Sequence, residues 1–196
     1  MAEKKIIFRI GAVLALTAAL FVLLPAREGG GADRAALEAL WKGGEEALEA
    51  GEIDTALQKF EKALELDRHQ PRTWNYLGGI HFLQQDYFKA LLNFKQAFAL
   101  DPWDARAGNN VATAYEHLGQ YERAEQFFLR AIEIDESYTV PYRNLGVLYS
   151  RHLDKPGLAR KYWEAFLAAS PRGKAAEEVR AELEKLEEGT PDSPSP

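Results

Sequence analysis

The sequence has no cysteine among its 196 residues and only four histidines. Without cysteine it can form no disulfide, thiolate nucleophile, thiolate-bound zinc site or iron–sulfur cluster. The histidines include no pair at the helical spacing of a metal site, and they stand at His69, His81, His117 and His152. No glycine loop precedes the Lys-Ser/Thr pair that phosphate binding requires. The sequence therefore predicts a protein that is not an enzyme and that has no cofactor and no metal site.

Positive charge is scarce outside the N-terminus. The net charge is -6, but residues 1–27 hold four basic residues against one acidic residue. The remainder of the chain is therefore strongly acidic. Nucleic acids require clustered Lys and Arg to meet their phosphates. We expect no nucleic-acid partner.

The N-terminus contains one long apolar run, Ile6 to Leu24, which reads IIFRIGAVLALTAALFVLL. As a helix it would rise about 28 Å, close to the thickness of the bilayer hydrocarbon. Its only charge, Arg9, can reach the headgroups together with Lys4 and Lys5. The basic flank should remain in the cytoplasm. Residues 1–24 are thus predicted to be a cytoplasmic N-terminus and a single transmembrane helix in the inner membrane, with the remaining chain on the periplasmic side.

Two alternatives to this anchor stay open. Ile10 to Leu24 also has the length of a signal-peptide core, which would be cleaved. A site ending Leu24-Pro25-Ala26 places a bulky Leu where a small residue is preferred, whereas Gly30-Gly31-Ala32 fits better but lies further away. The run could also be a buried helix of a cytosolic protein. Residues 25–36 are expected to form a linker and the start of the first helix, with PAREGGG as a flexible tether.

A period of about 34 residues organises most of the remaining sequence. One helical signal recurs as Trp74, Leu77, Gly78 and His81, then as Gly108, Val111, Ala112 and Tyr115, then as Tyr142, Leu145, Gly146 and Tyr149. A second recurs as Ala56, Phe60 and Ala63, then as Ala90, Phe94 and Ala97, then as Ala124, Phe128 and Ala131. Gly51 and Gly119, with Asp86 beside them in register, are expected to mark the turns between paired helices. The small residues allow neighbouring helix axes to approach to about 8–10 Å.

This pattern resembles the tetratricopeptide repeat (TPR) family over residues 37–172. The resemblance implies an all-α fold, a right-handed α-solenoid of helix-turn-helix units spanning 37–70, 71–104, 105–138 and 139–172. Residues 173–188 carry a narrow apolar stripe of Val179, Leu183 and Leu186, as expected of a C-terminal capping helix. Residues 189–196 read GTPDSPSP and are expected to be a disordered tail.

The resemblance also implies a groove lined by the first helix of each unit, where side chains are free to bind an extended peptide. The predicted groove residues are Arg72, Asn75, Tyr76, Arg106, Asn109, Asn110, Thr113, His117, Arg143, Asn144 and Arg151. Asn110 and Asn144 occupy one position in successive units, where an amide can both donate to and accept from a peptide backbone. Arginines at 72, 106 and 143 suit acidic groups of a partner. The family's carboxylate clamp is not expected, because only Asn110 matches it.

The sequence therefore predicts a non-enzymatic interaction module. Our hypothesis is a membrane-tethered TPR scaffold or adaptor of bacterial type that binds a protein or peptide, including partners with acidic groups, during envelope protein assembly or maturation. The alternative is a structural TPR scaffold that associates with copies of itself.

Overall fold

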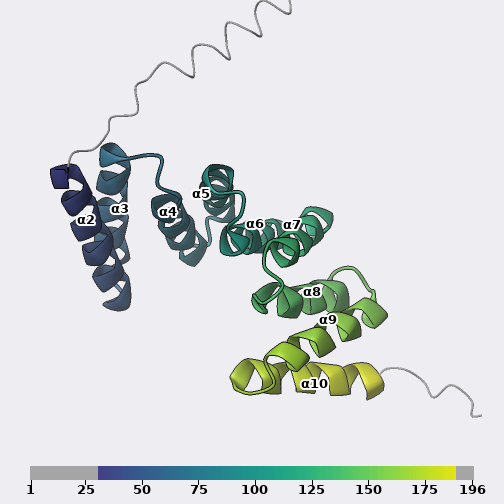
Figure 1. Ribbon diagram of the computed structural model, residues 1–196. Coiled ribbons are helices and arrows are strands. Elements are labelled where there is room, and N and C mark those ends of the chain that lie inside the picture. The colour runs from purple at the N-terminus through teal and green to yellow at the C-terminus, as the bar shows by residue number, and fades with distance from the viewer. Residues whose placement is uncertain (1–30, 189–196) are drawn as a thin grey trace, which may run out of the picture. The chain divides into compact units, whose positions relative to one another are not determined.

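The computed structural model describes residues 31–188, and this part of the chain is entirely helical outside its turns. The helices are α2 (Gly31–Glu49), α3 (Ile53–Leu66), α4 (Pro71–Leu83), α5 (Tyr87–Leu100), α6 (Ala105–His117), α7 (Tyr121–Ile134), α8 (Val140–Arg151), α9 (Pro156–Ala169) and α10 (Lys174–Glu188). Figure 1 shows them following one another from purple to yellow. The chain divides into two compact units, residues 1–36 and 37–196. Of the first unit the structure describes only residues 31–36, which begin α2.

The second unit is built from helix pairs. Helices α4 and α5, α6 and α7, and α8 and α9 pack closely, and each pair also contacts the next along the chain. Such nearest-neighbour packing defines an α-solenoid. The all-α solenoid expected from the repeat is therefore confirmed for the described residues.

The buried positions follow the period found in the sequence. Ala56, Phe60 and Ala63 of α3 are fully buried. Their equivalents 34 and 68 residues later, in α5 and α7, are buried as well. The alanines leave room for the aromatic rings between helices, which explains why small and large residues alternate at fixed spacing.

The turns within the pairs also repeat, with one difference from expectation. Gly51 and Gly119 adopt positive φ angles of 77° and 71°, in the left-handed region where glycine is favoured. In the second pair the left-handed residue is Gln85, with φ of 61°, and not the neighbouring Asp86. Asp86 instead caps α5, because its carboxylate accepts a hydrogen bond from the backbone N–H of Lys89 at 3.1 Å.

Helix α10 closes the end of the described chain. Its apolar stripe behaves as expected, since Val179 is buried and Leu183 and Leu186 pack on the core cluster that contains Trp163. The predicted transmembrane helix within residues 1–24 and the tail at 189–196 lie outside the described residues, as do residues 25–30 of the predicted linker. None of the helices in residues 31–188 has the length and apolar character needed to cross a membrane.

Candidate binding groove

Three pockets lie in series on the second unit and share lining residues. We call them the polar pocket (about 600 Å³), the apolar pocket (about 350 Å³) and the charged pocket (about 400 Å³). Asn75, Tyr76 and Asn110 line both the polar and the apolar pocket. Thr113 lines both the apolar and the charged pocket. The three pockets therefore form one groove, which follows α4, α6 and α8, the first helix of each pair.

In the polar pocket, one arginine is engaged by the protein itself. The Arg72 guanidinium pairs with the Glu45 carboxylate, which also accepts a hydrogen bond from the Tyr76 hydroxyl. These donors, Tyr76 first and then Arg72, lower the pKa of Glu45. Arg72 also lies 4.8 Å from the centre of the Trp41 ring, a cation–π distance. Arg106, by contrast, is exposed, and its guanidinium has no ion pair among residues 31–188.

The apolar pocket lies in the middle of the groove. Its walls come from α2, α4, α5 and α6, and its apolar lining consists of Leu48, Gly79, Ile80, Phe82, Leu83 and Phe94. Leu83 is 65% exposed, although it is a large hydrophobic residue. The Asn75 side-chain oxygen is buried without a hydrogen-bond partner.

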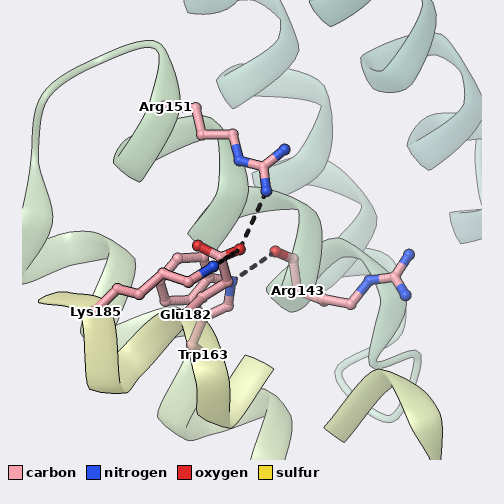
Figure 2. Close-up of polar contacts among 5 residues, drawn as sticks. All are labelled: Arg143, Arg151, Trp163, Glu182 and Lys185. Atoms are coloured by element: carbon pink, nitrogen blue, oxygen red, sulfur yellow. Dashed lines mark hydrogen bonds and ion pairs between the residues drawn. The ribbon is translucent and has the colours of Figure 1, made fainter. Parts of the chain in front are cut away.

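The charged pocket lies at the α10 end. Figure 2 shows Arg151 and Lys185 meeting at the Glu182 carboxylate, with N···O distances of 3.3 and 3.2 Å. The Trp163 indole N–H donates to the Arg143 carbonyl at 3.2 Å, whereas the Arg143 guanidinium extends away from Glu182 (Figure 2). Arg143, like Arg106, has no side-chain ion pair among the described residues.

Glu116 forms part of the same pocket and is unusually placed for a carboxylate. Its side chain is 16% exposed, and its Oε1 lies 3.7 Å from Nε2 of His152. Burial raises the pKa of Glu116 to about 7, and the positive charge of Arg151 opposes that shift. Burial and the nearby His152 lower the pKa of His117. The pocket thus contains one carboxylate, that of Glu116, that titrates close to neutral pH.

Ten of the eleven predicted groove residues line these pockets. The exception is Asn109, which is only 5% exposed. Its side-chain oxygen accepts a hydrogen bond from Asn144 Nδ2 at 3.1 Å. Asn109 points between α6 and α8, so the prediction that it is free to bind a ligand is wrong. Asn144 keeps a place in the charged pocket, but one of its donor groups is held by Asn109.

Two sets of lining residues were not predicted from the sequence. The first is the apolar wall, since Leu48, Phe82 and Leu83 have the helical spacing of core residues. The sequence still distinguishes these positions from the repeated core, because polar residues occupy the equivalent positions of later units. The second is Glu178 and Glu182, which α10 contributes to the charged pocket. Among the described residues no group of three or more His, Asp or Glu side chains is arranged to hold a metal ion.

Comparisons with known proteins identify the repeat. A family model described as Tetratricopeptide repeat matches residues 70–137, and a second with the same description matches residues 42–92. The chain carries tetratricopeptide repeats. Its fold is that of a protein-interaction module, as the resemblance in the sequence implied. By sequence, this TPR chain spans only 8% and 11% of the length of two curated relatives that it matches.

Solved structures of other proteins support the fold. The pilF protein of Pseudomonas aeruginosa has a TM-score of 0.72 at 25% identity, with 79% of this chain and 69% of that chain covered. MamA of Desulfovibrio magneticus RS-1, from residue 41 to its end, has a TM-score of 0.63 at 22% identity, covering 69% and 76%. The first TPR of Spaghetti (RPAP3), bound to the HSP90 peptide SRMEEVD, has a TM-score of 0.57 at 25% identity, covering 62% and 94%.

Proposed function

We propose that this chain is a non-enzymatic, membrane-tethered adaptor whose TPR groove binds an extended segment of another protein. The observation that carries the proposal is the linkage of three pockets through shared residues. An elongated groove suits an extended chain better than a compact small molecule. The Spaghetti TPR is solved with a peptide bound, which supports this use of the fold.

Two arginines in this groove are suited to acidic groups of the partner. Arg106 lines the polar pocket and Arg143 lines the charged pocket. Neither guanidinium has an ion pair among residues 31–188, so each can pair with a carboxylate of the ligand without breaking a contact in the fold. Arg72 and Arg151 are less suitable, because Glu45 and Glu182 already hold them.

The proposed location rests on the sequence. The apolar run from Ile6 to Leu24, with its basic flank, favours a single-pass anchor in the inner membrane and a TPR unit on the periplasmic side. An adaptor in that place suits envelope protein assembly or maturation. Protease protection in spheroplasts tests this part: digestion of the TPR unit from outside supports the orientation, and full protection in intact spheroplasts refutes it.

Charge reversal at the two unpaired arginines tests the groove. In an Arg106→Glu/Arg143→Glu variant, crosslinking in native membranes followed by mass spectrometry should lose the main partner that the wild type captures. A matched control is Lys62→Glu/Lys95→Glu, which changes the net charge equally at exposed positions of α3 and α5 outside the three pockets. Capture of the same partner by the arginine variant would show that the groove is not its binding site.

Self-association is a second candidate, and one observation favours it. Phe88 and Leu92 on α5 are 62% and 53% exposed. The equivalent residues of the neighbouring units are polar or charged, namely Asp54, Gln58, Glu122 and Gln126. Mass measurement of the full chain in detergent, with and without a Phe88→Asp/Leu92→Asp change, tests this candidate. A monomer at every concentration would exclude it.

A further inference from the structure

The walls of the apolar pocket depart from the pattern of the repeat. Positions 48, 82, 116 and 150 are equivalent, and they carry Leu, Phe, Glu and Ser. Positions 83, 117 and 151 carry Leu, His and Arg. Because the later units fold with polar residues there, the solenoid itself does not require apolar residues at these positions. Leu48 and Phe82 also pack against the core clusters, whereas Leu83 is 65% exposed, so helix packing does not explain the apolar residue at position 83.

Two adjacent glycines of α4 also differ in whether helix packing explains them. A Cβ atom at Gly78 would lie 2.4 Å from Cδ1 of Phe94, so packing against α5 explains that glycine. A Cβ atom at Gly79 would meet nothing within 4 Å. Glycine within a helix is less stable than alanine, and the equivalent positions in later units carry Thr113 and Val147. At Gly79 the absent side chain leaves open space in the apolar pocket.

Polar groups border this space where an extended chain would pass. The Asn75 side-chain oxygen is buried and lacks a donor, which is an unfavourable state for an amide. The Asn110 amide comes from α6 and lines the same pocket. Both residues also line the polar pocket, so they stand at the junction of the two. A peptide backbone that crosses the junction offers the N–H donor that the Asn75 oxygen lacks once its amide turns toward the groove.

We propose that the apolar pocket binds one large apolar side chain of the partner's extended segment, next to backbone contacts at Asn75 and Asn110. This inference rests on the proposed function and makes it more specific. The partner segment combines an apolar anchor residue with an acidic group directed toward Arg106 or Arg143. A purely acidic or purely polar segment would leave the pocket empty and would bind weakly.

The test uses the full-length chain in detergent and a phage-displayed library of random linear dodecapeptides. Peptides selected on the wild type should share one large apolar position. Binding of a synthetic peptide is then measured by fluorescence anisotropy. Replacement of the shared residue by Ser should weaken binding about tenfold or more, as expected for loss of an anchor in a desolvated pocket.

Two pairs of protein variants locate the anchor. Gly79→Leu fills the pocket and should weaken binding about tenfold or more, while Gly157→Leu, another open helical glycine, should leave it unchanged. Leu83→Asp changes an exposed wall residue, and so the fold should tolerate it. It should also weaken binding, whereas Leu66→Asp, at an exposed leucine outside the three pockets, should not.

The outcomes separate this inference from the proposed function. Peptides that bind Gly79→Leu and Leu83→Asp as tightly as the wild type, but lose affinity for Arg106→Glu/Arg143→Glu, overturn the apolar anchor and leave the groove in place. Peptides indifferent to all of these changes, or a selection that yields no binding peptide, overturn both.

Discussion

Replacement of Gly146 by Ala should destabilise the fold although it adds only one methyl group. Gly146 lies in α8 and faces the Trp163 ring of α9. A Cβ atom there would lie 2.1 Å from Nε1 and 2.2 Å from Cδ1 of that ring. Trp163 is almost fully buried, and its indole N–H donates to the Arg143 carbonyl. The ring therefore has to move by more than 1 Å to reach ordinary contact distances of about 3.5–4 Å.

Three contributions set the expected change in the free energy of unfolding, and the third opposes the other two. Overpacking a well-filled core costs about 1–3 kcal/mol. Displacing the indole weakens a buried hydrogen bond that contributes about 1 kcal/mol. Alanine is more favourable than glycine within a helix by about 1 kcal/mol, which offsets part of the cost. The expected net loss in the free energy of unfolding is about 1–3 kcal/mol.

Denaturant unfolding followed by circular dichroism measures this loss. The control is Gly79→Ala in α4, where the added methyl meets nothing within 4 Å and the free energy of unfolding should rise by up to about 1 kcal/mol. A second variant adds Trp163→Phe to Gly146→Ala, which reproduces the pairing of Ala112 with Phe128 one unit earlier. The phenyl ring should relieve much of the clash. If Gly146→Ala is as stable as the wild type, the steric reasoning is wrong.

Two further predictions concern buried polar groups. Thr73→Val removes the oxygen that accepts the Trp41 indole N–H at 2.9 Å, so the free energy of unfolding should fall by about 1–2 kcal/mol; an unchanged denaturant midpoint would contradict this. The pKa of Glu116 is about 7 in the folded protein and 4.5 in the unfolded chain, so the folded state holds the proton more tightly. Stability should therefore fall as pH rises from about 4.5 to 7, by up to about 3 kcal/mol. Glu116→Gln should remove that dependence in unfolding measurements at pH 5 and pH 8, and an equal slope in both proteins would exclude Glu116 as its source.

The helix pairs could be predicted from the sequence because packing repeats. Each unit solves the same steric problem, so Phe60, Phe94 and Phe128 recur at one spacing beside alanines. Because the same spacing occurs in several units, each unit supports the helix assignment of the others. Asp86 marks the turn of the second pair as expected, but the left-handed residue there is Gln85, which gives no sequence signal comparable to that of a glycine.

The groove could be predicted only in part, because its contacts join residues that no period relates. Glu45, which holds Arg72, is 27 residues away, and Glu182, which holds Arg151, is 31 residues away. Neighbouring positions on a helix differ by about 100° in direction. A face assigned by counting therefore includes residues at its edge, and Asn109 turns into the helix interface while Asn110 faces the groove.

The difference between repeating and non-repeating positions separates stability from recognition in this chain. Positions that pack, such as Gly78 and Ala112, stay small in every unit because the facing aromatic ring leaves no space. Positions that face the groove change from unit to unit, as Gly79, Thr113 and Val147 do. A packing constraint of the solenoid would act on the same position in every unit. Packing therefore does not explain the variation at positions that face the groove, whereas binding of a partner does. Gly78 and Gly79 stand side by side on one helix, yet a methyl group at the first strikes Phe94 and a methyl group at the second enters an open pocket. Packing within the fold thus explains Gly78, whereas the open space at Gly79 is what the proposed apolar anchor requires.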